Sequence, residues 1–186
     1  SPAPRPQPAT PSPIDPHDSE VSGFIFKIQA NMDPNHRDRI AFMRVCSGRF
    51  TRGMKLRNVH AGRDFKVPNP MFFFAREREL VEEAVAGDIV GIPNHGTLSV
   101  GDTLTEGSVR TVTGIPNFAP ELIRRARITD PSKSKQLQKA MSDLSEEGVI
   151  QMFRPIMGSN WFVGAVGPLQ FEVFVSRAAA EYNIEV

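Results

Sequence analysis

The chain has 186 residues, of which 40% are hydrophobic and 23% are charged, and its net charge is +1 at pH 7. This composition is typical of a globular protein with one large domain or two small ones, and it excludes fibrous and low-complexity classes. No run of about 18 apolar residues and no secretory leader occurs, and the single cysteine, Cys46, excludes an intramolecular disulfide. We therefore expect a cytoplasmic protein that does not cross a membrane.

Residues 1–20 contain seven of the 16 prolines and no apolar run. Such a segment buries too little apolar surface to offset its conformational entropy. The sequence therefore predicts a disordered or extended linker over 1–20.

Residues 21–112 are predicted to form a small antiparallel β-barrel. Two segments, 24–29 and 40–45, alternate between two faces in the way that half-buried strands do. Short strand-like runs separated by glycines follow, with few helical windows. The alternating residues are Phe24, Phe26 and Ile28 against Ile25, Lys27 and Gln29, and Ile40 and Phe42 against Ala41, Met43 and Val45.

Residues 113–186 are predicted to form a second domain that begins with a strand over 118–128. Asp130 can cap a helix that has Pro131 at its first position and Gly148 after its end. The helix carries an apolar stripe at helical spacing, namely Leu137, Ala140, Met141 and Leu144.

A hairpin of 149–153 and 161–166 should follow, with its turn at 158–160. A second helix is expected from Pro168, and a last strand from Ile184. The apolar face of this helix would consist of Phe171, Phe174, Val175, Ala178 and Tyr182. The order βαββαβ predicts a ferredoxin-like α/β domain.

No sequence pattern for catalysis stands out. The chain has no G-x-x-x-x-G-K-[ST] phosphate-binding loop, and Asp88–Gly91, which fits D-x-x-G, is interpreted as barrel structure. Cys46 and the four scattered histidines lack the spacing of a metal site, so Cys46 is interpreted as a small buried apolar residue. We expect no enzymatic activity and no cofactor or metal in this chain.

A basic run lies between positions 36 and 66, where nine lysines or arginines and two aspartates give a local charge of +7. Such a field attracts phosphates, so we predict contact with RNA through its backbone and shape. A merely solvated basic face is the alternative, and His95 can equally belong to a plain turn. The candidate contacts are His36, Arg37, Arg39, Arg49, Arg52, Lys55, Arg57 and His95.

Three arginines, Arg124, Arg125 and Arg127, crowd the first strand of the second domain. Strand alternation puts Arg124 on one face and the other two on the opposite face. They can pair with the carboxylates or phosphates of a partner, or form salt bridges within the domain.

Longer segments resemble known proteins. Residues 36–56 and 86–104 are similar to the second-domain barrel shared by translational GTPases. Residues 26–45, 114–155, 163–173 and 181–186 resemble the peptide chain release factor 3 family more specifically, and the resemblance covers about 22–186.

This resemblance implies the non-catalytic, ribosome-binding part of a GTP-dependent termination factor that promotes dissociation of class-I release factors. In that family a GTPase domain, which binds GTP and Mg²⁺, precedes the barrel and packs on it. The barrel touches small-subunit ribosomal RNA and the third domain meets a small-subunit ribosomal protein. The fragment would be monomeric, and its α/β domain would be truncated at the C-terminus.

Two alternatives remain. The domains could belong to a related elongation factor or ribosomal protection protein. A stand-alone enzyme or small-molecule sensor would belong to a different class, since fold does not fix function.

Overall fold

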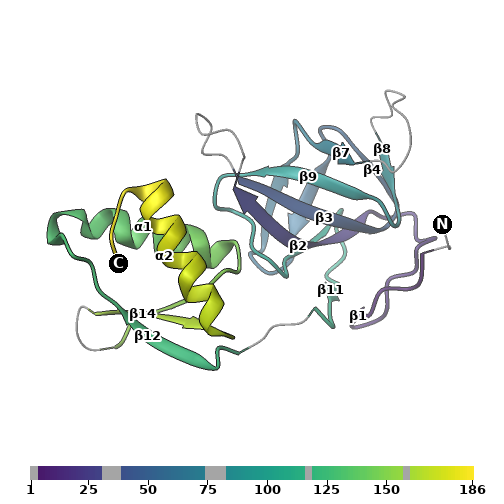
Figure 1. The fold of residues 1–186 in the computed structure, drawn as a ribbon. Coiled ribbons are helices and arrows are strands. Elements are labelled where there is room, and N and C mark those ends of the chain that lie inside the picture. The colour runs from purple at the N-terminus through teal and green to yellow at the C-terminus, as the bar shows by residue number, and fades with distance from the viewer. Residues whose placement is uncertain (1–3, 31–38, 74–82, 116–118, 157–159) are drawn as a thin grey trace. The chain divides into compact units, whose positions relative to one another are not determined.

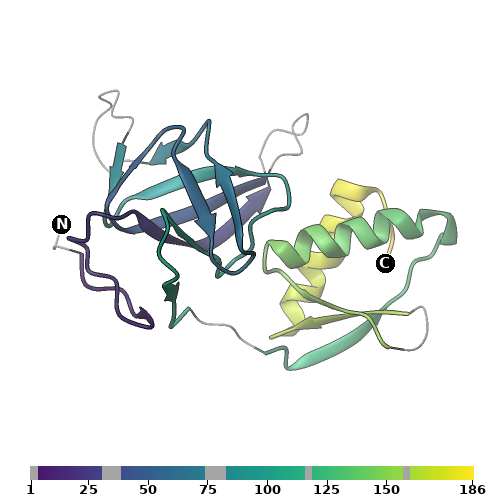
Figure 2. The ribbon, with the colours of Figure 1, turned by 180° about the vertical axis from the view of Figure 1, so that it is seen from behind.

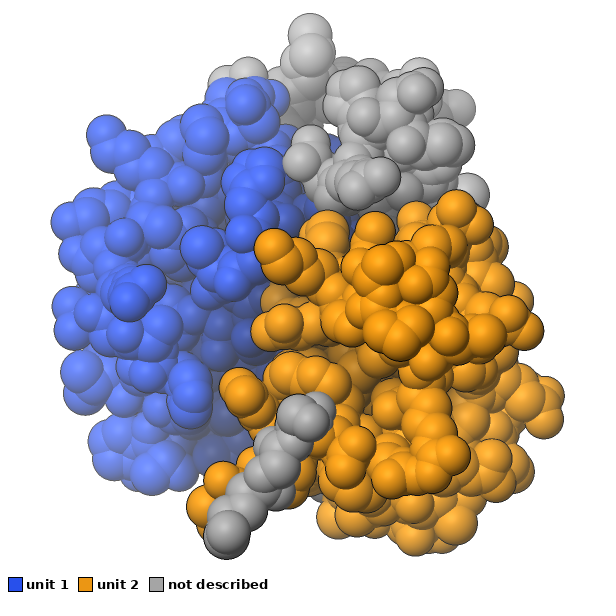
Figure 3. All heavy atoms as spheres, turned by 90° about the vertical axis from the view of Figure 1, so that its left-hand side faces the viewer, with its two compact units in different colours: residues 1–115 blue, residues 116–186 orange. Residues whose placement is uncertain are grey.

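The computed structural model describes residues 4–30, 39–73, 83–115, 119–156 and 160–186. The chain divides into two compact units, residues 1–115 and 116–186 (Figure 3). Each unit is described by itself below.

The first unit is built around a curled antiparallel sheet of seven strands in the order β6-β5-β10-β2-β3-β9-β7 (Figures 1 and 2). A short second ladder pairs β4 with β8, and a third pairs β1 with β11. This architecture confirms the prediction of a small antiparallel barrel-type domain. The strands are β1 (Ala9–Thr10), β2 (Ser22–Ala30), β3 (Arg39–Ser47), β4 (Arg49–Thr51), β5 (Lys55–Asn58), β6 (Arg63–Lys66), β7 (Met71–Phe73), β8 (Glu83–Val85), β9 (Ile89–Asn94), β10 (Thr103–Thr105) and β11 (Thr111–Val112).

The core of this unit lies on the inner face of the curled sheet. Alternation along β3 places Ala41, Met43 and Val45 in that core, as the sequence predicts. Phe50 of β4 and Ala84 of β8 close over the same cluster.

A β-bulge changes the pattern in β2. The ladder between β2 and β3 pairs Ile25 with Met43 but Lys27 with Phe42, so Phe26 is the extra residue. The bulge shifts the alternation by one residue, and therefore Ile25 and Ile28 are both buried while Phe26 is 38% exposed. The simple alternation expected over 24–29 is interrupted at this point.

The N-terminal segment is extended, which is one of the two predicted alternatives, but it is packed on the first unit and is not a disordered linker. Residues 4–20, called here the strap, pack on the outer face of the sheet. Ile14 is fully buried against Cys46 and Val112, in a cluster separate from the main core. Backbone hydrogen bonds join Gln7 to Ile14 and β1 to β11, so the segment is held in an extended, strand-like conformation. Proline fixes φ at a value that this conformation tolerates.

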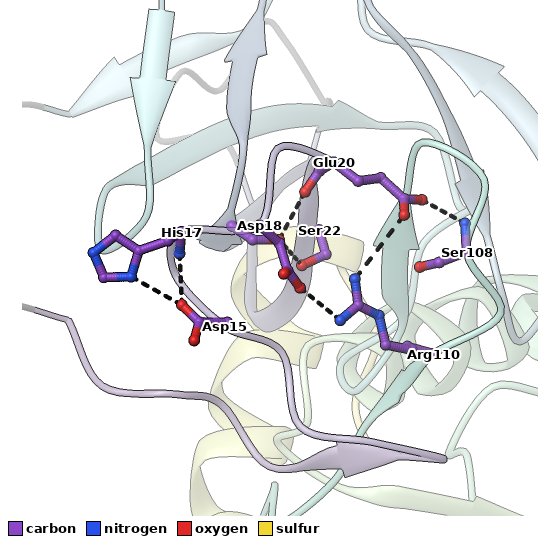
Figure 4. Close-up of polar contacts among 8 residues, drawn as sticks. Asp15, His17, Asp18, Glu20, Ser22, Ser108 and Arg110 are labelled. Atoms are coloured by element: carbon purple, nitrogen blue, oxygen red, sulfur yellow. Dashed lines mark hydrogen bonds and ion pairs between the residues drawn. The ribbon is translucent and has the colours of Figure 1, made fainter.

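Polar contacts hold the end of the strap to the segment that leads into β11 (Figure 4). Arg110 donates from Nη1 to Asp18 Oδ2 at 2.7 Å, and its Nη2 lies 4.0 Å from Glu20 Oε2. Glu20 also accepts the backbone N–H of Ser108 through Oε1 and the Ser47 hydroxyl through its carbonyl oxygen. The strap is therefore tied to residues that lie far from it in the sequence.

The second unit consists of an antiparallel sheet in the order β12-β14-β13 with two helices on one face (Figures 1 and 2). This is the strand order of three of the four strands in a ferredoxin-like sheet, which agrees with the predicted fold. The elements are β12 (Leu122–Ala126), a 3₁₀ turn (Pro131–Lys133), α1 (Ser134–Glu146), β13 (Gln151–Phe153), β14 (Trp161–Ala165) and α2 (Pro168–Tyr182).

Local sequence signals mark the start and the end of α1. Asp130 accepts the backbone N–H of Ser132, Pro131 opens the first turn, and Gly148 takes a φ of 78° after α1. The buried residues of α1 are the four predicted ones: Leu137, Ala140, Met141 and Leu144.

The second helix and the C-terminal end differ in part from expectation. Phe171, Phe174 and Ala178 of α2 are buried, but Val175 is 42% exposed. Residues 184–186 are not a strand, although Ile184 is buried and the Glu185 carbonyl accepts the N–H of Thr129. Of the predicted hairpin turn, residues 158 and 159 lie outside the described part of the chain.

Candidate functional site

The predicted basic contacts of the first unit lie on three separate pieces of its structure. His36 and Arg37 fall outside the described residues. The others lie on the β5–β6 hairpin, on and after β4, and at the end of the β3–β9 ladder.

The β5–β6 hairpin carries the clearest concentration of charge. Lys55 pairs with Lys66 across the ladder and Arg57 with Asp64, so these four side chains share the outward face, while Leu56 and Phe65 point inward. Lys55 Nζ lies 2.8 Å from Asp64 Oδ2, and Arg57 Nη1 lies 3.4 Å from Oδ1. The hydrogen bond from Lys55 lowers the pKa of Asp64 below its ordinary value, so the carboxylate stays charged between the two cations.

Two hairpin residues were missed as individual candidates. Arg63 and Lys66 belong to the basic run, and both are exposed. Neither forms an ion pair with the described residues, whereas Lys55 and Arg57 share Asp64. Strand register would have revealed that Lys66 lies beside Lys55, but register cannot be read from a single strand.

The arginines around β4 are partly neutralised. Arg49 donates from Nη1 to Glu83 Oε2 at 2.5 Å across the β4–β8 ladder. Arg52 is exposed in the turn that follows β4. This piece therefore presents less net charge than the sequence suggests.

Arg39 and His95 lie at the same end of the sheet. Arg39 pairs with Asn94 at the end of the β3–β9 ladder, and His95 follows directly. Asn94 is buried and builds the loop, because its Oδ1 accepts the N–H groups of Gly96, Thr97 and Leu98. His95 is therefore held exposed at a rigid loop rather than at a mobile tip.

Arg124 and Arg125 of β12 lie on opposite faces of the second sheet, and Arg127 lies after the strand. Arg124 lies on the helix side, where its Cζ is 4.9 Å from the centre of the Phe171 ring. Arg125 aligns with Phe162 of β14 on the opposite face, and Arg127 follows the strand; both are exposed. Arg124 is therefore engaged within the unit, while Arg125 and Arg127 point to solvent.

The remaining candidates are structural. Asp88 of the D-x-x-G tetrapeptide accepts the N–H of Val85 in a β-turn before β9, so this segment does not form a loop around phosphates. Cys46 is 6% exposed, and burial raises the pKa of its thiol to about 11. It lies under the strap rather than in the main barrel core.

Within the described ranges, no group of three or more His, Cys, Asp or Glu side chains could hold a metal ion. No described helix is both long and apolar enough to span a bilayer.

Both units match known domain families. Residues 20–107 match the family model described as elongation factor G domain 2. Residues 112–186 match the model described as class II release factor RF3, C-terminal domain.

A solved structure has the same fold. It is a crystal structure of a protein from Thermus thermophilus, with 23% sequence identity and a TM-score of 0.70. The match covers 90% of this chain but 25% of that one, so this chain spans about a quarter of the length of the protein that it resembles. The first unit is thus similar to domain 2 of elongation factor G, and the second unit is similar to the C-terminal domain of the class II release factor RF3.

Proposed function

We propose that this chain is the ribosome-binding, non-catalytic part of a GTP-dependent translation termination factor that promotes dissociation of class-I release factors. The observation that carries this proposal is the release-factor match over 112–186, directly after an elongation-factor domain. In the whole factor, GTP and Mg²⁺ would be bound by a separate G domain that contacts the barrel. These two units would recognise the ribosome and transmit the movement of that domain as a rigid-body shift.

The outward face of the β5–β6 hairpin is the best-supported contact for small-subunit ribosomal RNA. Three cations share this face with one carboxylate; Lys55 and Arg57 pair with Asp64, whereas Lys66 has no ionic partner among the described residues. Cations fixed on a rigid ladder can neutralise backbone phosphates without reading sequence. Arg39 and His95 offer a second, smaller contact for RNA at the end of the β3–β9 ladder.

Sedimentation with purified small subunits tests the binding. We expect co-sedimentation to weaken steeply as salt rises from dilute to physiological, because each neutralised phosphate releases counterions. The variant Lys66→Gln should bind several-fold more weakly and with a shallower salt dependence. Lys135→Gln, which removes one exposed charge from α1, is the matched control and should bind like the unaltered chain. Co-sedimentation that does not change with salt concentration would refute the phosphate contacts.

A related elongation factor or ribosomal protection protein is the second candidate, because the elongation-factor match covers the first unit. The full-length protein distinguishes the two. A termination factor should accelerate departure of a labelled class-I release factor from post-release ribosomes, and should not support translocation. The opposite pattern would favour the elongation factor.

We further propose that the factor acts as a monomer in the cytoplasm. Analytical ultracentrifugation at micromolar concentration should give the mass of one chain, and a concentration-dependent dimer would contradict this.

A further inference from the structure

The second unit has a sheet face that its helices leave uncovered. The buried cluster under α1 and α2 takes Val163 and Ala165 from β14, so the residues that alternate with them point the other way. Residues that share this orientation are Phe162 and Gly164, with Ile123 and Arg125 of β12. We call this side of the sheet the open face.

Strand register aligns a cation and two aromatic rings across the open face. Arg125 of β12 pairs with Phe162 of β14, and Phe162 pairs with Phe153 of β13. Directly opposed residues in an antiparallel ladder have Cβ atoms about 5 Å apart, so these three side chains leave the sheet from neighbouring positions on one face. Phe153 is 38% exposed although it is a large apolar side chain.

A second row of residues lies beside the first on the open face. It runs from Ile123 through Gly164 to Gln151. A Cβ on Gly164 would lie 2.7 Å from Cε2 of Phe153 and 2.7 Å from Cβ of Pro120. The Phe153 ring and Pro120 therefore both lie over Gly164, which is buried.

Arginines outnumber carboxylates on the open face. Arg125 and Arg127 are exposed and form no hydrogen bond or ion pair within the described part of the unit, while one carboxylate, Glu121, is exposed just before β12 in the same alternation. Arg124, in contrast, is already placed over Phe171 on the helix side. Two guanidinium groups beside the exposed ring of Phe153 and the half-buried ring of Phe162 suit a ligand that has both phosphates and planar apolar surfaces.

We propose that the open face binds an unpaired segment of RNA, with bases stacked on Phe162 and Phe153 and backbone phosphates held by Arg125 and Arg127. Other sheets of this βαββαβ order bind unpaired RNA by aromatic side chains on their uncovered face. Bases in a duplex are already stacked and paired, so the platform selects single strands. This contact is separate from the β5–β6 hairpin and does not depend on the proposed function of the first unit.

Fluorescence anisotropy with the intact 186-residue chain tests the proposal. The probes are a labelled eight-nucleotide oligouridylate, the same length of oligoadenylate, and a duplex RNA of matched length. Both single strands should bind more tightly than the duplex, since stacking tolerates any base but needs a free one.

The deciding variant is Phe162→Leu, which keeps an apolar side chain but removes the π-face. It should weaken single-strand binding roughly tenfold, while Phe162→Tyr should bind like the unaltered chain. Arg125→Gln should weaken binding severalfold and reduce the salt slope by about 0.7. Lys135→Gln on α1, which removes one exposed charge outside the open face, should leave the binding of single strands unchanged.

Circular dichroism and thermal melting show whether each variant is folded; Phe153→Leu, at a more exposed site, replaces Phe162→Leu if that chain does not fold. Equal binding of single strands and duplex would overturn the proposal. A second pattern would also overturn it: the folded Phe→Leu variants bind RNA with full affinity, Arg125→Gln binds RNA more weakly, and polyglutamate competes with RNA as well as unlabelled RNA does. That pattern would identify the face as a site for an acidic protein segment.

Discussion

At the scale of single residues, two glycines with the same backbone conformation have different surroundings. Gly48 and Gly53 both have positive φ, 69° and 77°. A Cβ on Gly48 would lie 2.6 Å from the carbonyl carbon of Glu20, the last residue of the strap, whereas a Cβ on Gly53 would meet nothing within 4 Å. Gly48 is therefore required by packing as well as by its dihedral angles.

We expect Gly48→Ala to lower the free energy of unfolding by several kcal/mol, because backbone has to move to admit the methyl group. Gly53→Ala, its control, should cost only about 1 kcal/mol for the left-handed conformation. Urea denaturation of both variants measures the difference. Equal losses would show that the strap does not pack closely on Gly48.

Because the Cys46 thiol is buried, we expect the stability of the chain to depend on pH in the alkaline range. Its pKa is about 11 in the folded chain against an ordinary value of 9.0, because burial disfavours the thiolate. Below pH 9 both states hold the proton, and above it the unfolded state loses the proton first. Stability should therefore decline from pH 9 to 11, by about 1 kcal/mol at pH 10 relative to Cys46→Ala. Parallel stability curves for the two chains, measured by urea denaturation between pH 8 and 10, would contradict the buried thiol.

At the scale of elements, the strap behaves as part of the first domain. It joins the outer face of the sheet through Ile14, and its end is bound to Arg110 and Ser108 (Figure 4). The elongation-factor match begins at residue 20, so most of the strap lies outside the matched domain. The sheet is thus buried locally on both faces.

We predict that Ile14→Ala destabilises the first unit by about 2–5 kcal/mol, as for other fully buried aliphatic side chains. Val109→Ala, at a position that is 73% exposed in the segment contacted by the strap, should change stability by less than about 0.5 kcal/mol. Chemical denaturation of residues 1–115 gives both values. An Ile14→Ala loss as small as that of the control would mean that the strap is not anchored.

At the scale of the whole molecule, the two units have separate cores. Among the described residues, the clusters of the first unit include none after Ile115, and the cluster of the second unit begins with Ala126. The net charge of +1 does not describe how charge is distributed over the molecule, because positive charge is concentrated locally, for example on the β5–β6 hairpin.

A unit with its own core should fold alone. We predict that residues 116–186, made separately, unfold cooperatively, and that Leu144→Ala lowers their melting temperature markedly because Leu144 is fully buried. Leu169→Ala, where the side chain is 68% exposed, should melt almost like the unaltered unit. Calorimetry that shows no transition for the separate unit would refute its autonomy.

The sequence alone determined the features that depend on neighbours within about one turn or one strand. Alternation at 40–45, the Asp130 cap and the stripe on α1 follow from local periodicity and local hydrogen bonds. The order of a β domain followed by an α/β domain could also be predicted, because apolar residues recur with a different spacing in strands and in helices.

Only the tertiary structure decided which distant residues meet. The bulge at Phe26, the burial of Ile14 against Val112, the sharing of Asp64 by Lys55 and Arg57, and the row of Arg125, Phe162 and Phe153 all depend on register between separate segments. Register is fixed by the packing of the complete sheet, and a slip of one residue would reverse every side chain. For that reason the sequence located the basic and aromatic residues, but the fold decided which of them share a surface.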